Sequence, residues 1–445
     1  MKIPLLHALR AGHKSTIAFT GSGGKSSAMF QLARELSRDV SVIVTATAHL
    51  GIWQIPLADH HVILKREIGL QELEHEFKGV TLLISSIDGD RTLPLDSSTL
   101  DQVHEYCKDQ SIPLLIEADG SRQKPLKAWA AHEPPIPTFV DQVVEVAGFE
   151  GLGKPLSADH VHRPEIFSEL SGLTIGEVIT PEALTRVLMD PEGGQKNIPK
   201  TARKTLLLNQ AETAELQAIA QGMSQALLKG FDSIIVASLK EGEIFAVHEP
   251  VAGIVLAAGE SKRFGQPKQL LDWKGQPFVR AVASKALEVG LSPVIVVTGA
   301  NSERVESALV DLDVKIAKNS DWKNGQGRSM RTAAQILEDE GNVGAAIFLL
   351  TDQPQVTTSI LRALVEKHAE GLYPVVAPLV IDQRANPVLF DRVTFPDLKK
   401  IEGDVGGRSI FHKYHVEYLP WHDDRLLLDV DTPEQYQRLI SDETL

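Results

Sequence analysis

An apolar run that ends in a glycine-containing polar loop is the feature that most constrains the fold of this chain. Residues Val251 to Ala258 have the length and the Val, Ile and Leu content of a buried parallel strand. Glycines let a backbone approach an anion closely, and two cations at the same rim stabilise that anion. The stretch therefore predicts a strand followed by a phosphate-binding loop, which contains Gly259, Ser261, Arg263, Gly265 and Lys268.

The N-terminal half contains a second pattern of the same kind. Residues Thr16 to Thr20 predict a strand, GSGGKSS follows, and a helical spacing of apolar residues comes next. Backbone N–H groups of such a loop, with a lysine and a serine, can hold phosphates and Mg²⁺, and acids at a neighbouring strand end can complete the site. We expect ATP or GTP there, with a bare glycine-rich turn as the alternative. The predicted residues are Gly21, Gly24, Lys25, Ser26, Glu117 and Asp119.

Strand and helix patterns alternate along the whole chain, which predicts an α/β protein of two doubly wound domains, a P-loop-like domain over 1–249 and a Rossmann-like domain over 250–445. The segment from Ala130 to Pro164 is rich in Pro, Gly and His, and we interpret it as an irregular lid or subdomain. The remaining predicted strands are Val40–Thr45, Val80–Ser85, Pro113–Ile116, Leu206–Leu208, Ser233–Ala237, Val294–Thr298, Ala345–Leu350 and Leu426–Val430, and the predicted helices of the second half lie near 279–289 and 330–337.

Composition excludes several classes of partner. The net charge of -14 argues against a nucleic-acid backbone, which needs a basic face. No apolar run reaches the roughly 18 residues of a membrane helix, and the first residues lack the order of a signal peptide, so we expect a cytoplasmic protein. The single cysteine, Cys107, excludes an internal disulfide and a cysteine metal cluster. Small phosphorylated molecules are the expected substrates.

The order of residues in LAAGESKRFGQPK resembles the signature loop of the molybdenum cofactor cytidylyltransferases and their guanylyl relatives. This resemblance implies a Rossmann-like nucleotidyltransferase domain with Mg²⁺ as its cofactor. It places Arg263 and Lys268 on phosphates and assigns Asp352, in TDQP, to the metal. The residues that it implies for binding the nucleotide are Ala257, Ala258, Gly259, Ser261, Gly325 and Ser329.

Further segments of the second half extend this resemblance. RANPVLF and EGDVGGR resemble the family segments that face the pterin phosphate, which implies Asn386, Asp404 and Arg408 as second-substrate residues. Asp429 and Asp431 lie two apart on a predicted strand and so point to one face, where either could complete the metal site. The same segment also fits a helix start, with Asp431 or Thr432 as N-cap, Pro433 at the first position and Glu434 in the first turn.

Three segments of the first half, GSGGKSS, TATAHLG and IEADGSRQKPLKAWAAHEP, resemble the selenium-dependent hydroxylase accessory proteins over roughly the first 240 residues. This resemblance implies a role in maturation of a molybdenum hydroxylase, whose apoenzyme is the expected partner. The segment NQAE, which begins at Asn209, is similar to a degraded N-K-x-D guanine-reading motif. His49, His132, His160 and His162 fit loop hydrogen bonding better than a metal site.

The predicted function is transfer of CMP from CTP to a molybdopterin phosphate with release of pyrophosphate. CTP is preferred because guanine-using family members tend to have LAGG where this chain has LAAG, and the methyl of Ala258 narrows the pocket. Two alternatives remain. One is transfer to a sugar or isoprenoid phosphate, or use of GTP, and the other is a nucleotide-gated carrier of finished cofactor.

Overall fold

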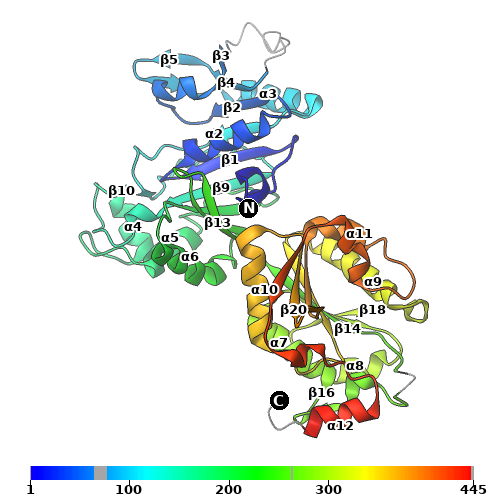
Figure 1. The fold of residues 1–445 in the computed structure, drawn as a ribbon. Coiled ribbons are helices and arrows are strands. Elements are labelled where there is room, and N and C mark those ends of the chain that lie inside the picture. The colour runs from blue at the N-terminus through cyan, green and yellow to red at the C-terminus, as the bar shows by residue number, and fades with distance from the viewer. Residues whose placement is uncertain (1, 65–77, 262–263, 442–445) are drawn as a thin grey trace. The chain divides into compact units, whose positions relative to one another are not determined.

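The computed structural model describes residues 2–64, 78–261 and 264–441. The chain divides into two compact units, Met1–His248 and Glu249–Leu445, here called unit 1 and unit 2. Each unit has its own sheet and its own hydrophobic clusters. Figure 1 shows unit 1 in blue to green and unit 2 in green to red.

Unit 1 is built on one extended sheet in the order β13-β12-β11-β9-β1-β7-β2-β4-β3. Its paired strands are parallel, except that β13 is antiparallel to β12 at the edge. Each central strand is a continuous buried run, as expected for strands covered on both faces. The strands are β1 Thr16–Gly21, β2 Val42–Ala46, β3 His60–Ile63, β4 Val80–Ile84, β7 Leu114–Glu117, β9 Gln142–Gly148, β11 Arg203–Asn209, β12 Ser233–Ser238 and β13 Glu243–His248.

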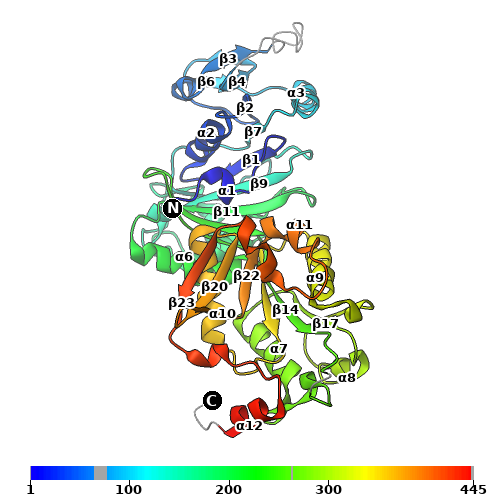
Figure 2. The same ribbon diagram turned by 45° about the vertical axis from the view of Figure 1, so that its right-hand side comes forward.

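Helices cover both faces of this sheet (Figure 2). Helix α2 packs on β1, β2 and β7, while α3 buries Val103 and Cys107 in a cluster with Ala18 of β1. Helices α4, α5 and α6 share another cluster with β11 and β12. The helices are α1 Leu5–Ala8, α2 Lys25–Leu36, α3 Ser97–Gln110, α4 Pro164–Ser171, α5 Pro181–Met189 and α6 Ala214–Leu227; short elements are β5 Ser86–Asp88, β6 Arg91–Leu93, β8 Leu126–Lys127, β10 Val161–His162 and the 3-10 turns Ile52–Leu57 and Phe149–Gly151.

The prediction of an irregular lid over Ala130 to Pro164 is wrong for the middle of that segment. Residues Gln142–Gly148 form β9, a fully buried strand between β1 and β11. Two apolar residues on each side flank Glu145 in this strand, and the segments before and after the strand are rich in Pro and Gly. Because of the acid and these Pro- and Gly-rich neighbours, the residue pattern did not indicate a strand at this position.

Unit 2 is built on a mixed sheet in the order β18-β17-β14-β19-β22-β20-β21, with β23 paired to β20. Strands β14, β17, β18 and β19 are parallel, whereas β22 is antiparallel to both β19 and β20. The sheet is therefore mixed, whereas the doubly wound domain predicted from the sequence would have a parallel sheet. The strands are β14 Val251–Ala257, β15 Asp272–Trp273, β16 Gln276–Pro277, β17 Val294–Thr298, β18 Lys315–Lys318, β19 Ala345–Leu350, β20 Val375–Val380, β21 Gln383–Arg384, β22 Val388–Asp391 and β23 Val416–Pro420.

The helices of unit 2 lie on both faces of its sheet (Figure 1). One cluster joins α7 and α10 to the sheet, and the other joins α9 and α11 to it. The helices are α7 Phe278–Val289, α8 Ser302–Ser307, α9 Gln326–Glu340, α10 Thr358–Gly371, α11 Phe395–Leu398 and α12 Pro433–Ser441, with 3-10 turns at Lys268–Leu270, Trp322–Asn324, Arg392–Thr394, Gly407–Lys413 and Asp424–Leu427. Among the described residues, none of the helices combines the length and the apolar character needed to cross a membrane.

Candidate functional site

Unit 2 contains a cavity of about 1020 Å³ at the carboxyl ends of β14 and β19. Parallel α/β sheets place ligand sites at this edge, because the loops after neighbouring strands converge there. The cavity brings together segments that lie far apart in the sequence. Its predicted residues are Ala258, Gly259, Ser261, Lys268, Gly325, Ser329, Asp352, Asp404, Asp429 and Asp431, and other lining residues include Glu260, Gln269, Trp322 and Thr351.

Lys268 lies between two carboxylates in this cavity. Its Nζ is 3.1 Å from Oδ2 of Asp352 and 2.7 Å from Oδ1 of Asp431. Partial burial opposes the charge of the lysine, but Asp352 and Asp431 outweigh burial and raise its pKa. The amine therefore stays charged at a position where it can contact anionic oxygens of a ligand.

The segment after β23 reaches the cavity without forming a strand. The predicted strand over Leu426 to Val430 is wrong, because a 3-10 turn at Asp424–Leu427 is followed by irregular backbone. Two glutamines of the loop after β19 hold this backbone. Gln353 donates to Oδ1 of Asp429 at 2.7 Å and to the carbonyl of Leu426 at 3.2 Å, and Gln355 donates to the carbonyls of Leu428 and Arg425 at 2.7 and 3.0 Å. The two acids thus share one cavity, although strand periodicity is not the reason.

The three acids differ in their surroundings. Desolvation, followed by the negative charge of Asp352, raises the pKa of Asp429. Asp431 is paired with Lys268, and its backbone N–H donates to Oε1 of Gln435 in α12 at 2.8 Å. Thr432 accepts a hydrogen bond from the N–H of Gln435 at 3.3 Å, so the side chain that caps the helix is Thr432.

The glycine-rich turn before α9 packs directly on the loop that contains Asp404. Gly325 has a φ of 99°, and a Cβ built on it would lie 2.5 Å from the carbonyl oxygen of Gly403. The N–H of Gly327 donates to that carbonyl at 3.1 Å. Only glycine fits at position 325, because both the backbone conformation and the approach of Gly403 exclude a side chain. The contact brings Asp404 to the cavity.

Ser261 organises the first loop through its own backbone and hydroxyl. Its φ is 58°, and its Oγ accepts a hydrogen bond from the N–H of Lys268 at 3.0 Å. Gln269 donates to the carbonyls of Ala257 and Gly259 at 3.2 and 2.6 Å, which holds the loop against the end of β14. These contacts fix the position of the Lys268 backbone, from which its side chain extends into the cavity.

The carboxylate oxygens of this cavity fit a hard divalent cation whose remaining coordination positions are filled by water and by oxygens of the substrate. In the described part of the chain, no three His, Cys, Asp or Glu side chains are already placed to hold a metal ion. Oδ1 of Asp352 is nevertheless buried and has no hydrogen-bond partner among the described residues. Mg²⁺ takes one or two carboxylates together with water and substrate phosphate oxygens, so Asp352 with Asp429 or Asp431 suffices in number.

Unit 1 contains a cavity of about 1030 Å³ beside the loop between β1 and α2. Its wall includes predicted residues from two strand ends, namely Gly24, Lys25 and Ser26 after β1 and Glu117 of β7. Arg122, Lys124, Lys154 and Lys240 add positive charge to the wall, and Glu150 and Glu212 add negative charge. Such a mixture suits a ligand with an anionic part and a polar neutral part.

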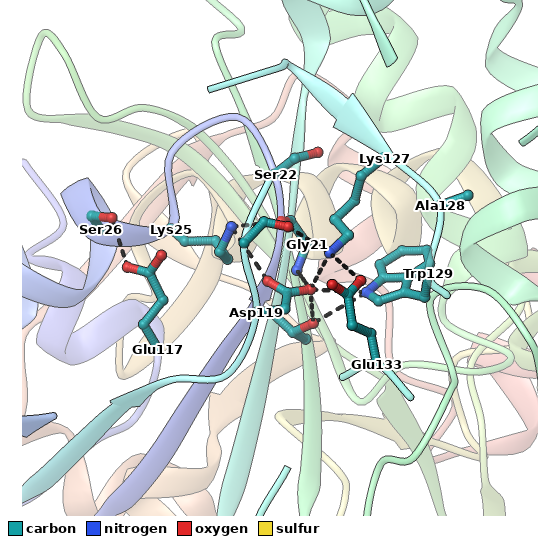
Figure 3. A network of polar contacts seen from close by, with 12 residues as sticks. Gly21, Ser22, Lys25, Ser26, Glu117, Asp119, Lys127, Ala128, Trp129 and Glu133 are labelled. Carbon is teal, nitrogen blue, oxygen red and sulfur yellow. Dashed lines mark hydrogen bonds and ion pairs between the residues drawn. The ribbon is translucent and has the colours of Figure 1, made fainter. Parts of the chain in front are cut away.

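Behind this cavity lies a buried network centred on Asp119 (Figure 3). Lys25 donates to the carbonyl of Gly21 at 2.7 Å and pairs with Oδ1 of Asp119 at 3.3 Å. Lys127 Nζ and Trp129 Nε1 reach Oδ2 of Asp119 at 2.8 and 3.0 Å. Burial would raise the pKa of Asp119, but the charges of Lys25 and Lys127 lower it. Asp119 therefore holds the two lysines as a charged acceptor.

Glu117 and Ser26 form the other side of the network. Ser26 donates to Oε2 of Glu117 at 2.6 Å and accepts a hydrogen bond from Gln54. Burial raises the pKa of Glu117, with Lys25 opposing. A hydroxyl and a carboxylate adjacent to a glycine loop are oxygen ligands that Mg²⁺ accepts.

Comparisons with known proteins give the family of each unit. Residues 253–418 match the MobA-like NTP transferase domain, and residues 17–165 match the YqeC protein. The nicotine blue oxidoreductase of Paenarthrobacter nicotinovorans is 30% identical over 200 residues, which cover 43% of this chain and 96% of that protein. A probable molybdenum cofactor guanylyltransferase of Bacillus mycoides (strain KBAB4) is 29% identical over 197 residues, which cover 42% of this chain and 93% of that protein.

The chain belongs to the MobA-like NTP transferases. Its N-terminal part is a YqeC domain, and the YqeC protein of Escherichia coli (strain K12) is 29% identical over 212 residues, 46% of this chain and 80% of that protein. Both predicted resemblances are confirmed. The C-terminal unit is a MobA-like nucleotidyltransferase domain, and the relatives that match it carry names of different activities.

Several predicted residues lie apart from the cavity of the MobA-like domain. Ala257 is buried in β14, where its carbonyl accepts from Gln269. Asn386 is half-buried between β21 and β22, and Arg408 is exposed and donates to the carbonyl of Arg384 at 3.0 Å. Arg263 lies outside the described residues.

The surroundings differ among four histidines of the YqeC domain, His49, His132, His160 and His162. His49 lines the cavity and contacts the carbonyl of Thr92 through Nδ1 at 3.0 Å, whereas His132 is exposed. His160 contacts the carbonyl of Pro155 at 3.2 Å. Burial, followed by the charge of Arg163, lowers the pKa of His162 to about 4.

Sequence reasoning missed four residues that position the site, of which Gln269 also lines the cavity. Gln269, Gln353 and Gln355 fix loops through backbone carbonyls, and Asn319 donates to Oγ of Ser329 at 3.1 Å. A buried glutamine carries no periodic signal. Gln269 and Gln353 directly follow the predicted site residues Lys268 and Asp352, and Gln355 lies three residues after Asp352; this proximity is the sequence signal that could have found them.

Proposed function

We propose that the MobA-like domain transfers CMP from CTP to the terminal phosphate of Mo-molybdopterin and releases pyrophosphate. The observation that carries this proposal is the position of Lys268 between Asp352 and Asp431 at the end of the parallel strands. A fixed cation beside acids that accept Mg²⁺ is the arrangement that a triphosphate requires.

The residues act by binding and by electrostatic stabilisation. Lys268, and Arg263 by its place in the motif, contact phosphate oxygens on which negative charge develops as the α-phosphorus is attacked. Asp352, with Asp429 or Asp431, would hold Mg²⁺, which neutralises phosphate charge when bound. Because the attacking group is already a phosphate oxygen, no general base and no covalent intermediate is needed.

The wall around Gly325 and Ser329 is proposed to hold the cytosine. Ala258 lies at this wall and is buried, and its Cβ would be 2.9 Å from a Cβ on Gly299. Its methyl is proposed to take space that a purine, which is larger than cytosine, would need. Asp404 lies at the same cavity. Asn386 and Arg408 do not line it, and they are proposed as residues for the pterin phosphate only because their segments resemble those of the family.

For the YqeC domain we propose nucleotide binding at the loop Gly21–Ser26, in support of maturation of a molybdenum hydroxylase apoenzyme. The cavity, the loop at the start of α2 and the pair Ser26–Glu117 support this assignment. Two nucleotide sites in one chain would let the transferase and the delivery of its product be driven separately.

The test is release of pyrophosphate by the purified full chain with Mg²⁺, Mo-molybdopterin and either CTP or GTP. We expect release with CTP at a rate that exceeds the rate with GTP. Faster release with GTP would overturn the choice of nucleotide, and release only with a sugar phosphate would overturn the acceptor. No release with any acceptor would leave the carrier function as the better account.

Oxidation–reduction is a second candidate, favoured by the name of the Paenarthrobacter relative. The acids around Lys268 argue against it, because nicotinamide transfers a hydride and gains nothing from three carboxylates. Consumption of NADH or NADPH by the full chain, without pyrophosphate release from CTP, would favour this candidate.

A further inference from the structure

The cavity of the YqeC domain is bordered by segments at the ends of six strands. Residues at or after the ends of β1, β2, β7, β9, β11 and β12 all contribute to its wall. The loops after β1 and β7 carry Lys25, Ser26 and Glu117, which suit phosphates and a cation. The loops after β11 and β12 carry a different set of groups, namely Asn209, Gln210, Glu212, Leu239 and Lys240.

Asn209 joins these two sides of the cavity. Its Nδ2 donates to the carbonyl of Gly23 at 2.7 Å, and its Oδ1 accepts from the N–H of Leu239 at 2.9 Å. Gly24 has a φ of 136°, and a Cβ built there would lie 2.4 Å from Nδ2 of Asn209. The side chain is buried, so these hydrogen bonds fix the loops after β11 and β12 relative to the glycine loop.

Glu212 presents a carboxylate on the side of the cavity that Asn209 fixes. It lines the cavity, and its Oε1 accepts from Oγ of Ser238 at 3.1 Å. Ser238 is fully buried at the end of β12 and therefore limits how the carboxylate can turn. Leu216 and Leu239 add apolar wall beside it, which suits the face of a heterocyclic ring.

A carboxylate is an acceptor on both of its oxygens and pairs best with two adjacent N–H donors. Among the common nucleobases, guanine offers such a pair, N1–H and the N2 amino group, on one edge. Adenine and cytosine place a ring nitrogen acceptor beside their amino group, which a carboxylate repels. A site built around such a pairing rejects bases that lack it.

We propose that the YqeC domain binds a guanine nucleotide, with the base edge on Glu212 and the phosphates on the loop Gly21–Ser26. This inference rests on the nucleotide binding proposed for that loop and adds the base to it. Asn209 is a positioning residue, because its contacts hold the base side and the phosphate side in register.

The test uses the full chain with Mg²⁺ and a saturating excess of CTP, so that the MobA-like domain is occupied. Binding of fluorescent N-methylanthraniloyl-GDP and of the corresponding ADP is titrated, with competition by GDP, ADP and xanthosine diphosphate. We expect GDP to bind at least about tenfold more tightly than ADP, the effect of one good paired contact.

A change of one group should switch the preferred base. Xanthine presents N1–H beside a carbonyl oxygen, which a carboxamide complements with its own oxygen and amino group. The variant Glu212→Gln should therefore lose affinity for GDP and gain affinity for xanthosine diphosphate, each by about tenfold. This gain cannot come from misfolding. Glu150→Gln is the matched control, since Glu150 lines the same cavity and contacts Gln210, and it should keep the preference for GDP.

The outcomes separate the two proposals. Equal binding of GDP and ADP would overturn the assignment of Glu212 and leave phosphate binding intact. An unchanged preference in Glu212→Gln would also overturn it. Absence of binding by every nucleoside diphosphate would overturn the proposed nucleotide site itself.

Discussion

Replacement of Asp352 by Asn tests the proposed metal role with little disturbance of the fold. The side chain is 25% exposed, stands on a loop after β19 and pairs with Lys268 at 3.1 Å. Partly exposed ion pairs contribute about 0–1 kcal/mol to stability, and in a domain of this size 1 kcal/mol corresponds to a Tm shift of about 2–4 °C. We therefore expect Asp352→Asn to lower the Tm by no more than a few degrees.

The effect on catalysis should be much larger. The carboxylate Oδ1 is buried without a hydrogen-bond partner among the described residues, and an amide is a poor ligand for Mg²⁺ in its place. Loss of one preorganised electrostatic contact costs about 2.7–4 kcal/mol, which corresponds to about 10²–10³ in kcat. The loss in kcat is measured as the rate of pyrophosphate release at saturating CTP and Mo-molybdopterin, over a range of Mg²⁺ concentrations.

Asp311→Asn is the matched control. Asp311 forms an ion pair with Arg280 in the same unit but does not line the cavity, and we expect its kcat to equal that of the parent protein. A kcat of Asp352→Asn within about threefold of the parent at every Mg²⁺ concentration would refute the reasoning. An equal loss in both variants would refute it as well, since the effect would then not depend on the cavity.

Three further predictions concern other residues of the two units. Lys268→Ala should lower kcat by at least about tenfold and change KM for CTP less, because the amine acts on developing charge; an effect on KM alone would assign it to ground-state binding. Gly325→Ala should destabilise the MobA-like domain by about 1–3 kcal/mol, whereas Gly341→Ala, which has a φ of 72° and open space, should cost less; equal Tm shifts in thermal unfolding would contradict the close approach of Gly403. Burial raises the pKa of Glu145 far above its unfolded value, so the folded state holds the proton more tightly and stability should fall as pH rises above about 4.5. The variant Glu145→Gln should flatten this dependence of Tm on pH, and an unchanged slope would show that Glu145 does not cause it.

The regular part of both units is the part that sequence periodicity predicts well. Strands such as β1, β14 and β19 are buried along almost their whole length, because both faces of the sheet are covered by helices. Glycine loops directly follow β1 and β14, so the positions of both cavities were visible as strand ends.

The central strand β9 shows where this reasoning fails. Glu145 interrupts its apolar run, and the carboxyl is buried, with neither oxygen hydrogen-bonded among the described residues. Burial, followed by the charge of Asp119, raises its pKa, so the buried group resists ionisation. A pattern of residue types cannot show this, because the compensation comes from Lys25 and Lys127 on other segments.

Periodicity also gave the wrong reason for the approach of Asp429 and Asp431 to Asp352. Their segment has no ladder hydrogen bonds of its own, and its backbone carbonyls are satisfied by Gln353 and Gln355. Such contacts depend on which loops meet in space. The sequence singled out these acids by their spacing on a predicted strand, and the structure gives a different reason that they come together.

The two lysines of the glycine loops differ in a way that decides how each domain can be probed. Lys268 is partly exposed and can be removed with little loss of stability. Lys25 is 4% exposed, and its removal would leave Asp119 in the core with one of its two cations missing. Breaking a buried pair costs about 3–5 kcal/mol, so Lys25→Ala would unfold part of the YqeC domain before it reported on phosphate binding. Glu212, at the exposed side of the same cavity, is the residue whose change reports on the ligand rather than on the fold.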